Sequence, residues 1–188
     1  MNNIEDLVVK LSHDPFNPEL NFKCALEYEK LNQTASAISF YLRTAEYGYQ
    51  THHTFVYTSL LKMAKCFEDQ RDRQWTVSNT LLQAIAYMPQ RPESWFLLAR
   101  FHERSANWQE AYTFANAGLV YANMNHEPLP AFVEYPGEYG LFFEKYVAGW
   151  WIGKKDETIW GLTNLLDKYD MTEEFVNACI YNLERIRE

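Results

Sequence analysis

The side chains that most often carry out catalysis or bind metal ions are few in this sequence, and their spacing does not match that of a known catalytic or metal-binding motif. His52 and His53 are adjacent, but no cysteine or carboxylate follows at the spacing of a metal-ligand set. His102 lies within an apolar pattern of helical period, where a half-buried packing histidine is a better interpretation than a catalytic base. We therefore interpret these histidines as structural.

Two pairs of acids are the remaining candidates for proton transfer. Glu68-Asp69 and Glu173-Glu174 could act as general acid and base only inside a cleft, and solvated helix ends account for them equally well. The chain has no Gly-x-Ser-x-Gly turn, no P-loop and no Gly-x-Gly-x-x-Gly motif. We expect no enzymatic activity, no metal ion and no cofactor.

The cysteines form an odd set, Cys24, Cys66 and Cys179, without Cys-x-x-Cys spacing. Such a set fits a reducing compartment better than a disulfide framework. Each cysteine falls within an apolar helical stripe, so we predict three buried thiols and a cytoplasmic location.

The elements that would position any site are helices, and the clearest pair runs from Arg91 to Val120. Pro92 can open the first helix, because a proline there lacks only an N–H group that would be unpaired anyway. A turn over residues 105–107 separates two apolar stripes of helical period. Small residues would let the two antiparallel helices approach closely; they are Ala99, Ala111, Ala115 and Gly118.

This hairpin resembles the tetratricopeptide repeat, or TPR. The residues that match the pattern are Trp95, Leu98, Ala99, His102, Ala111, Ala115 and Gly118. The resemblance implies an all-α fold, a right-handed α-solenoid of antiparallel helix pairs. It implies an interaction module and predicts almost nothing about catalysis.

The rest of the chain repeats the pattern less regularly. We predict a single TPR-like domain over residues 1–188, with hairpins at 18–48, 53–89 and 91–122. An N-terminal cap at 1–15, a degenerate fourth hairpin at 137–169 and a capping helix at 171–188 complete it. Gly48 is expected to end the first hairpin in the left-handed conformation that glycine tolerates.

The stretch from Tyr121 to Gly140 interrupts the helical pattern. It contains three prolines, two glycines and three tyrosines, which predicts an extended loop packed by its own aromatic side chains. Loops of this length are often functional.

A second resemblance is carried by the phrases NQTASAISFYLRTAEYG, RPESWFLLARFHE, EYPGEYG and GWWIGKKDE. They are similar to TPR-type segments attached to, or encoded beside, glycosyltransferase-like proteins of marine phages and giant viruses. The chain has no Asp-x-Asp pair for a metal-bound sugar nucleotide, so the resemblance implies an accessory module. A phage-encoded chain would reside in the host cytoplasm or in the virion.

Composition limits the classes of partner. The chain has 188 residues, 47% of them hydrophobic, and a formal net charge of −8. This charge repels nucleic acid and anionic membrane surfaces at long range. No apolar run approaches the roughly 20 residues that span a bilayer, and the acidic N-terminus is unlike a signal peptide. We expect no nucleic-acid and no membrane partner.

In a TPR stack, the first helix of each hairpin lines a concave groove, and the resemblance implies that a partner binds there. The residues predicted to line it are Lys23, Lys62, Lys65, Phe96, Arg100, Glu103 and Arg104. The four cations on the second and third hairpins would form a basic strip suited to an acidic or C-terminal peptide. The Lys and Asn set by which some TPR proteins grip chaperone C-termini is largely missing.

The predicted function is a non-catalytic scaffold that binds a protein or peptide partner in the groove. Two alternatives stay open: an accessory module of a glycosyltransferase system, and a structural, virion-type assembly protein. The second alternative would involve a homo-oligomer built on an apolar patch.

Overall fold

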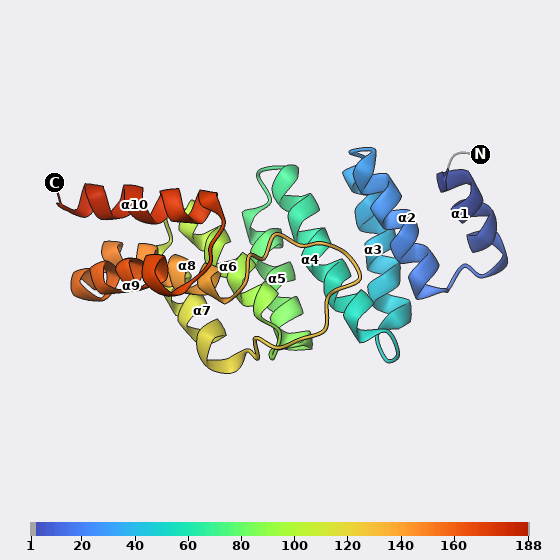
Figure 1. Cartoon of the computed structure of the whole chain (residues 1–188). Coiled ribbons are helices and arrows are strands. Elements are labelled where there is room, and N and C mark those ends of the chain that lie inside the picture. The colour runs from blue at the N-terminus through green and yellow to red at the C-terminus, as the bar shows by residue number, and fades with distance from the viewer. Residues whose placement is uncertain (1–2, 188) are drawn as a thin grey trace. The chain divides into compact units, whose positions relative to one another are not determined.

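The computed structural model describes residues 3–187, which contain ten α-helices and no strand (Figure 1). The helices are α1 (Asn3–His13), α2 (Pro18–Lys30), α3 (Thr34–Gly48), α4 (His53–Asp69), α5 (Gln74–Tyr87), α6 (Pro92–Arg104), α7 (Trp108–Tyr121), α8 (Glu138–Trp151), α9 (Lys155–Lys168) and α10 (Glu173–Arg187). The predicted all-α class is confirmed. The fourth hairpin, predicted as degenerate, is complete, with two helices of 14 residues each.

Local signals explain where helices begin. Pro18 and Pro92 each stand at the start of a helix, where the missing N–H costs nothing. The Asn17 side chain accepts a hydrogen bond from the backbone N–H of Leu20 at 3.0 Å and so caps α2.

Three hairpins close with the same turn. A residue of positive φ follows the first helix in each, namely Asn32, Ala106 and Gly153. The next residue's N–H then donates to a carbonyl five residues back, at 2.9 Å in all three, as Gln33 does to Tyr28. This is the left-handed helix ending of a tight αα-turn, so the α8/α9 hairpin repeats the geometry of α2/α3 and α6/α7.

Contacts divide the chain into two compact units. Unit 1 holds the chain up to Met88 together with Glu127–Val133, and unit 2 holds Pro89–His126 together with Glu134 onward. Each unit contains two hairpins and one terminal helix, α1 in unit 1 and α10 in unit 2. That residues 1–188 form a single domain stays a prediction.

The core of unit 1 lies between α2, α3 and α4. Its buried side chains are Phe22, Ala25, Ala37, Tyr41, Met63 and Cys66. Leu7 and Leu11 of α1 pack against Cys24 of α2, so α1 covers the outer side of the first hairpin. That residues 1–15 act as an N-terminal cap stays a prediction.

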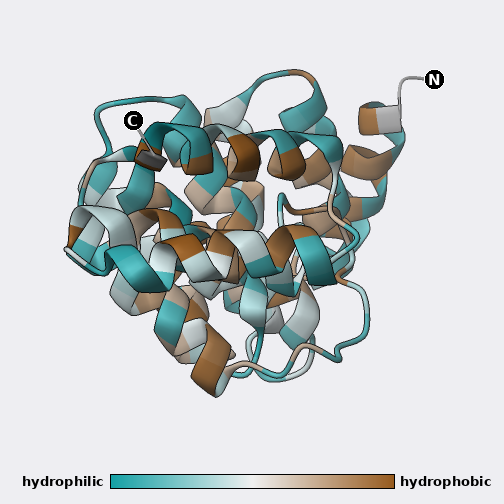
Figure 2. Ribbon diagram, turned by 60° about the vertical axis from the view of Figure 1, so that its left-hand side comes forward, coloured by the Kyte–Doolittle hydropathy of each residue, from teal (hydrophilic) through white to brown (hydrophobic). Residues whose placement is uncertain are grey.

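The core of unit 2 includes a cluster shared by α8, α9 and α10. Its buried side chains are Tyr139, Tyr146, Leu162, Leu165, Met171, Cys179 and Leu183. Helix α10 therefore covers the last hairpin, as predicted for residues 171–188. Brown and teal residues alternate along the helices in Figure 2, as expected when each helix buries one stripe.

Glycines in the helices allow neighbouring helices to pack closely against one another. Gly48 does not have a positive φ, so the predicted left-handed ending is wrong at this residue. It is the last residue of α3, and a Cβ there would lie 3.2 Å from atoms of Pro18 and Val56. The glycine thus lies in the close packing of α2, α3 and α4 and not in a left-handed turn.

Gly118→Ala tests the close approach of α6 and α7. An added Cβ would lie 2.6 Å from Trp95 Cβ, an atom fixed to the backbone of α6. We expect a loss of about 1–3 kcal/mol in the free energy of unfolding, because a packed helix pair must separate. Urea unfolding measures it, with Thr113→Ala on the exposed side of α7 as control; equal stability of the two variants would contradict the packing.

Candidate partner-binding faces

The first helices of successive hairpins are neighbours within each unit. Helix α2 contacts α4 in unit 1, and α6 contacts α8 in unit 2. We call the surfaces that these pairs form the first-helix faces of unit 1 and unit 2. All seven residues predicted to line a groove belong to α2, α4 or α6.

Lys62 is held inside a network of unit 1. Its Nζ lies 2.8 Å from Glu29 Oε1, and the other oxygen of Glu29 accepts a hydrogen bond from the Tyr41 hydroxyl. Burial, followed by the bond to Glu29, raises the pKa of Tyr41, so the phenol stays protonated and donates. Only 15% of the Lys62 side chain is exposed. This lysine joins α4 to α2 and α3 and is committed to the fold.

Lys65 and Lys23 are the more accessible cations of this face. Lys65 pairs with its own helix, at 3.0 Å from Asp69 and 3.8 Å from Glu68, and 39% of its side chain is exposed. Lys23 is exposed on α2 and lies 3.9 Å from Glu19. Pairs of this kind between neighbouring turns contribute little to stability.

Phe96 lies in the interior of unit 2. It is fully buried, and the ring of Tyr135 packs edge-on against it with centroids 5.6 Å apart. The Arg100 guanidinium lies 5.0 Å from the centre of the Phe96 ring. Tyr135 is one of the residues that cover Phe96, which the residue pattern of α6 alone does not reveal.

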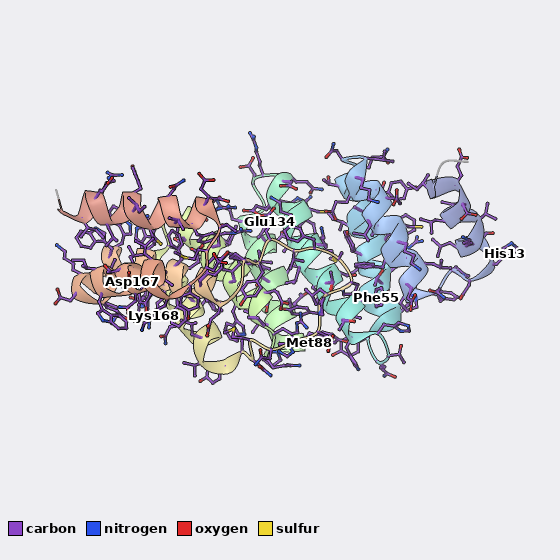
Figure 3. All side chains as sticks on the ribbon, viewed as in Figure 1. His13, Phe55, Met88, Glu134, Asp167 and Lys168 are labelled. Atoms are coloured by element: carbon purple, nitrogen blue, oxygen red, sulfur yellow. The ribbon has the colours of Figure 1, made fainter. Side chains whose placement is uncertain are left out.

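Arg100 forms an ion pair with the segment that precedes α8. Its Nη2 lies 2.8 Å from Glu134 Oε2. Figure 3 labels Glu134, which stands on the irregular segment between α7 and α8. The loop predicted between Tyr121 and Gly140 is therefore confirmed as irregular over residues 122–137, and it carries a carboxylate to the first-helix face of unit 2.

A buried carboxyl lies beneath the charges of α6. Glu144 on α8 is 3% exposed, and its Oε2 has no hydrogen-bond partner. Burial, and next the charge of Glu103, raise its pKa to about 8, against the opposing effect of Arg100 and Arg104. Near neutral pH it is mostly neutral, so it leaves the charge of Arg100 available to other carboxylates.

The remaining predicted residues lie at the open side of the same cluster. Glu103 is half-buried, and burial raises its pKa despite the nearby Arg104. Arg104 is exposed at the end of α6. Unit 2 thus brings Arg100, Glu103 and Arg104 together with Glu144, whereas the positions of unit 1 carry only lysines from the predicted set.

The sequence did not predict the ion pair of Glu29 with Lys62, nor the positions of Glu134 and Glu144. A usable signal existed for Glu144, which is a lone acid within the apolar run LFFEKYVAGWW. Nothing in the local pattern distinguishes Glu29 or Glu134 from solvated acids, because their partners are 33 and 34 residues away in sequence.

The other chemical side chains have structural partners. His102 stacks on Phe114 with centroids 5.4 Å apart, and burial lowers its pKa. His53 Nδ1 lies 2.8 Å from the Tyr87 hydroxyl. The three cysteines are buried free thiols, as predicted, and burial raises the pKa of each to about 11 or 12.

Metal-ion clusters and membrane-spanning helices are both absent from the described residues. Between residues 3 and 187, no group of three or more His, Cys, Asp or Glu side chains is arranged to hold a metal ion. Over the same part of the chain, no helix has both the length and the apolar character needed to cross a membrane.

The fold is that of TPR proteins. No family model and no curated protein matches the sequence. Among solved structures, MamA has 16% identity and a TM-score of 0.66 over 88% of this chain and 85% of its own. PilW, described as a widely conserved type IV pilus biogenesis factor, has 16% identity and a TM-score of 0.66 over 93% and 72% of the two chains.

A thermophilic TPR protein of Thermus thermophilus has 13% identity and a TM-score of 0.59, over 96% of this chain and 88% of its own. At these identities the likeness concerns the fold alone, and the predicted α-solenoid of TPR-like hairpins is confirmed. Nothing in these comparisons supports the resemblance to segments associated with glycosyltransferase-like proteins of phages and giant viruses.

Lys62→Glu tests whether this predicted groove residue is structural. The new carboxylate would face Glu29 in place of its cation, so we expect the free energy of unfolding to fall by about 1–3 kcal/mol. Lys23→Glu, the same change on exposed α2, should alter it by less than about 0.5 kcal/mol. Chemical denaturation of both variants measures the difference. A Lys62 variant as stable as the Lys23 variant would contradict a structural role for the network of Lys62, Glu29 and Tyr41.

Glu144→Gln tests the buried carboxyl. The folded-state pKa near 8 lies above the unfolded value, so the wild type loses stability as pH rises between the two values. The stability of the variant relative to wild type should therefore increase by about 1–3 kcal/mol from about pH 5 to about pH 8. Thermal unfolding across this range measures it, with Glu46→Gln at an exposed position of α3 as the control.

Proposed function

We propose that this chain is a non-catalytic scaffold that binds a protein or peptide partner on its first-helix faces. The TPR-type fold supports the proposal, because stacked hairpins present a row of first helices to one side.

The observation that carries the proposal is the presence of exposed cations on first helices of an acidic protein. Lys23 and Lys65 in unit 1 and Arg104 in unit 2 are the more accessible ones, although Lys65 pairs with acids of its own helix. Lys62 and Arg100 are largely buried in ion pairs. Exposed charge of this kind attracts an acidic partner and changes its association rate more than the stability of the fold. An acidic or C-terminal peptide is therefore the proposed partner class.

The test is affinity capture of the tagged protein's partners from its native lysate, compared between wild type and the double variant Lys65→Glu, Arg104→Glu. We expect at least one partner to be reduced about tenfold or more in the variant, because two attractive charges become repulsive. The matched control carries Lys155→Glu and Lys168→Glu, an equal charge change at two exposed positions of the second helix α9.

Each outcome has a distinct meaning. A partner lost in the double variant and retained in the control places binding on the first-helix faces. A partner retained in both variants contradicts the proposal. The second helices of the hairpins would then be the next candidate binding surface. Recovery of this chain alone would favour the alternative of a self-assembling structural protein, which sedimentation of the purified protein then checks.

A further inference from the structure

The first-helix face of unit 2 already holds a short extended segment of the same chain. Residues 134–137, here called the covering segment, precede α8 and contain neither helix nor strand. Two side chains attach it to α6: Glu134 pairs with Arg100 at 2.8 Å, and Tyr135 packs edge-on against Phe96. The segment thus binds α6 by a carboxylate and, one residue later, an aromatic ring.

Both attachment points are built into the unit. Only 16% of the Arg100 side chain is exposed, and its guanidinium lies against the Phe96 ring. The nearest buried acid, Glu144, is mostly neutral near pH 7 and does not neutralise this arginine. Arg100 and Phe96 therefore present a fixed cation beside a fixed aromatic surface, a combination that suits a carboxylate followed by a ring.

The covering segment is partly exposed. Glu134 is 46% exposed, although its carboxylate is paired. The Tyr135 hydroxyl has only a weak acceptor, the Met124 sulfur at 3.6 Å. Before the segment, Phe132 is 79% exposed, and after it Gly137 has a φ of 114°, a conformation that favours glycine. Phe132 and Glu134 are thus exposed, whereas Tyr135 and Pro136 are half-buried.

From these contacts we infer that the covering segment is an internal ligand, and that the site formed by Arg100 and Phe96 takes an extended partner peptide with a carboxylate followed by an aromatic residue and proline. The inference rests on the proposed function and names the partner chemistry at unit 2. The segment and the partner compete for one site, and the tether gives the segment an effective concentration on the order of millimolar.

The experiment is an NMR titration of the full ¹⁵N-labelled chain with the peptide FVEYPGE, which is the sequence of residues 132–138. The reporters are the backbone amides of α6 and the Nε–H of Arg100. Two proteins are compared: wild type and the variant Glu134→Gln, Tyr135→Ala, whose covering segment lacks both attachments. We expect the variant to bind the peptide about tenfold more tightly, because the internal competitor is removed.

Three controls make the result specific. Adding Arg100→Gln to the variant should abolish binding, and the peptide FVQAPGE should not bind. If the double variant loses its helical circular dichroism, Glu134→Gln alone removes the charge while keeping Tyr135 in place. It should still raise the affinity about threefold over wild type.

The inference is overturned by equal affinities of wild type and the folded variant, by binding that survives Arg100→Gln, or by no binding to the folded variant at all. These failures are separable from failure of the proposed function. A lysate partner that depends on Lys65 and Arg104 would stand even if FVEYPGE does not bind. Binding of the peptide without any such partner would leave Arg100 and Phe96 as a site that only the chain itself occupies.

Discussion

The structure depends on helices that approach one another more closely than ordinary side chains permit. Gly118 on α7 makes room for Trp95 on α6, and Gly161 on α9 makes room for the ring of Tyr146 on α8. In both hairpins a large aromatic residue occupies the volume that the glycine leaves empty. The glycine lowers helix propensity by roughly 1 kcal/mol, and the buried aromatic surface offsets this cost.

Tight packing of this kind decides which charges can take part in binding. Water is excluded between the helices, so a charged group near a helix contact must be paired or neutral. Lys62 is paired with Glu29, and Glu144 is neutral near pH 7 because its pKa is raised. Lys65, one turn further along α4, pairs with acids of its own helix and keeps 39% of its side chain exposed. Residues that look equivalent on a helical pattern therefore divide into structural and accessible ones.

The sequence predicted the helices well because the determinants of helices are local. Prolines at the starts of α2 and α6 and the period of apolar residues give their positions. The sequence did not predict which face of each helix packs against a neighbouring element. Gly48 has the type of a helix terminator but serves a helix contact, and Phe96 has the spacing of a groove residue but is covered by Tyr135. Both outcomes involve residues distant in sequence, Pro18 at 30 positions from Gly48 and Tyr135 at 39 positions from Phe96, which no local pattern contains.

The covering segment shows how one sequence can specify both a binding surface and its occupant. A tethered ligand is present at roughly millimolar effective concentration. A free partner must therefore outcompete the covering segment for the site before it can bind. If the covering segment bound α6 strongly, no partner could displace it. If it did not bind at all, the Phe96 ring would be exposed to water. One ion pair and one aromatic contact lie between these limits. The strength with which Glu134 and Tyr135 bind to α6 would thus set the affinity that a partner needs, without any movement of the helices.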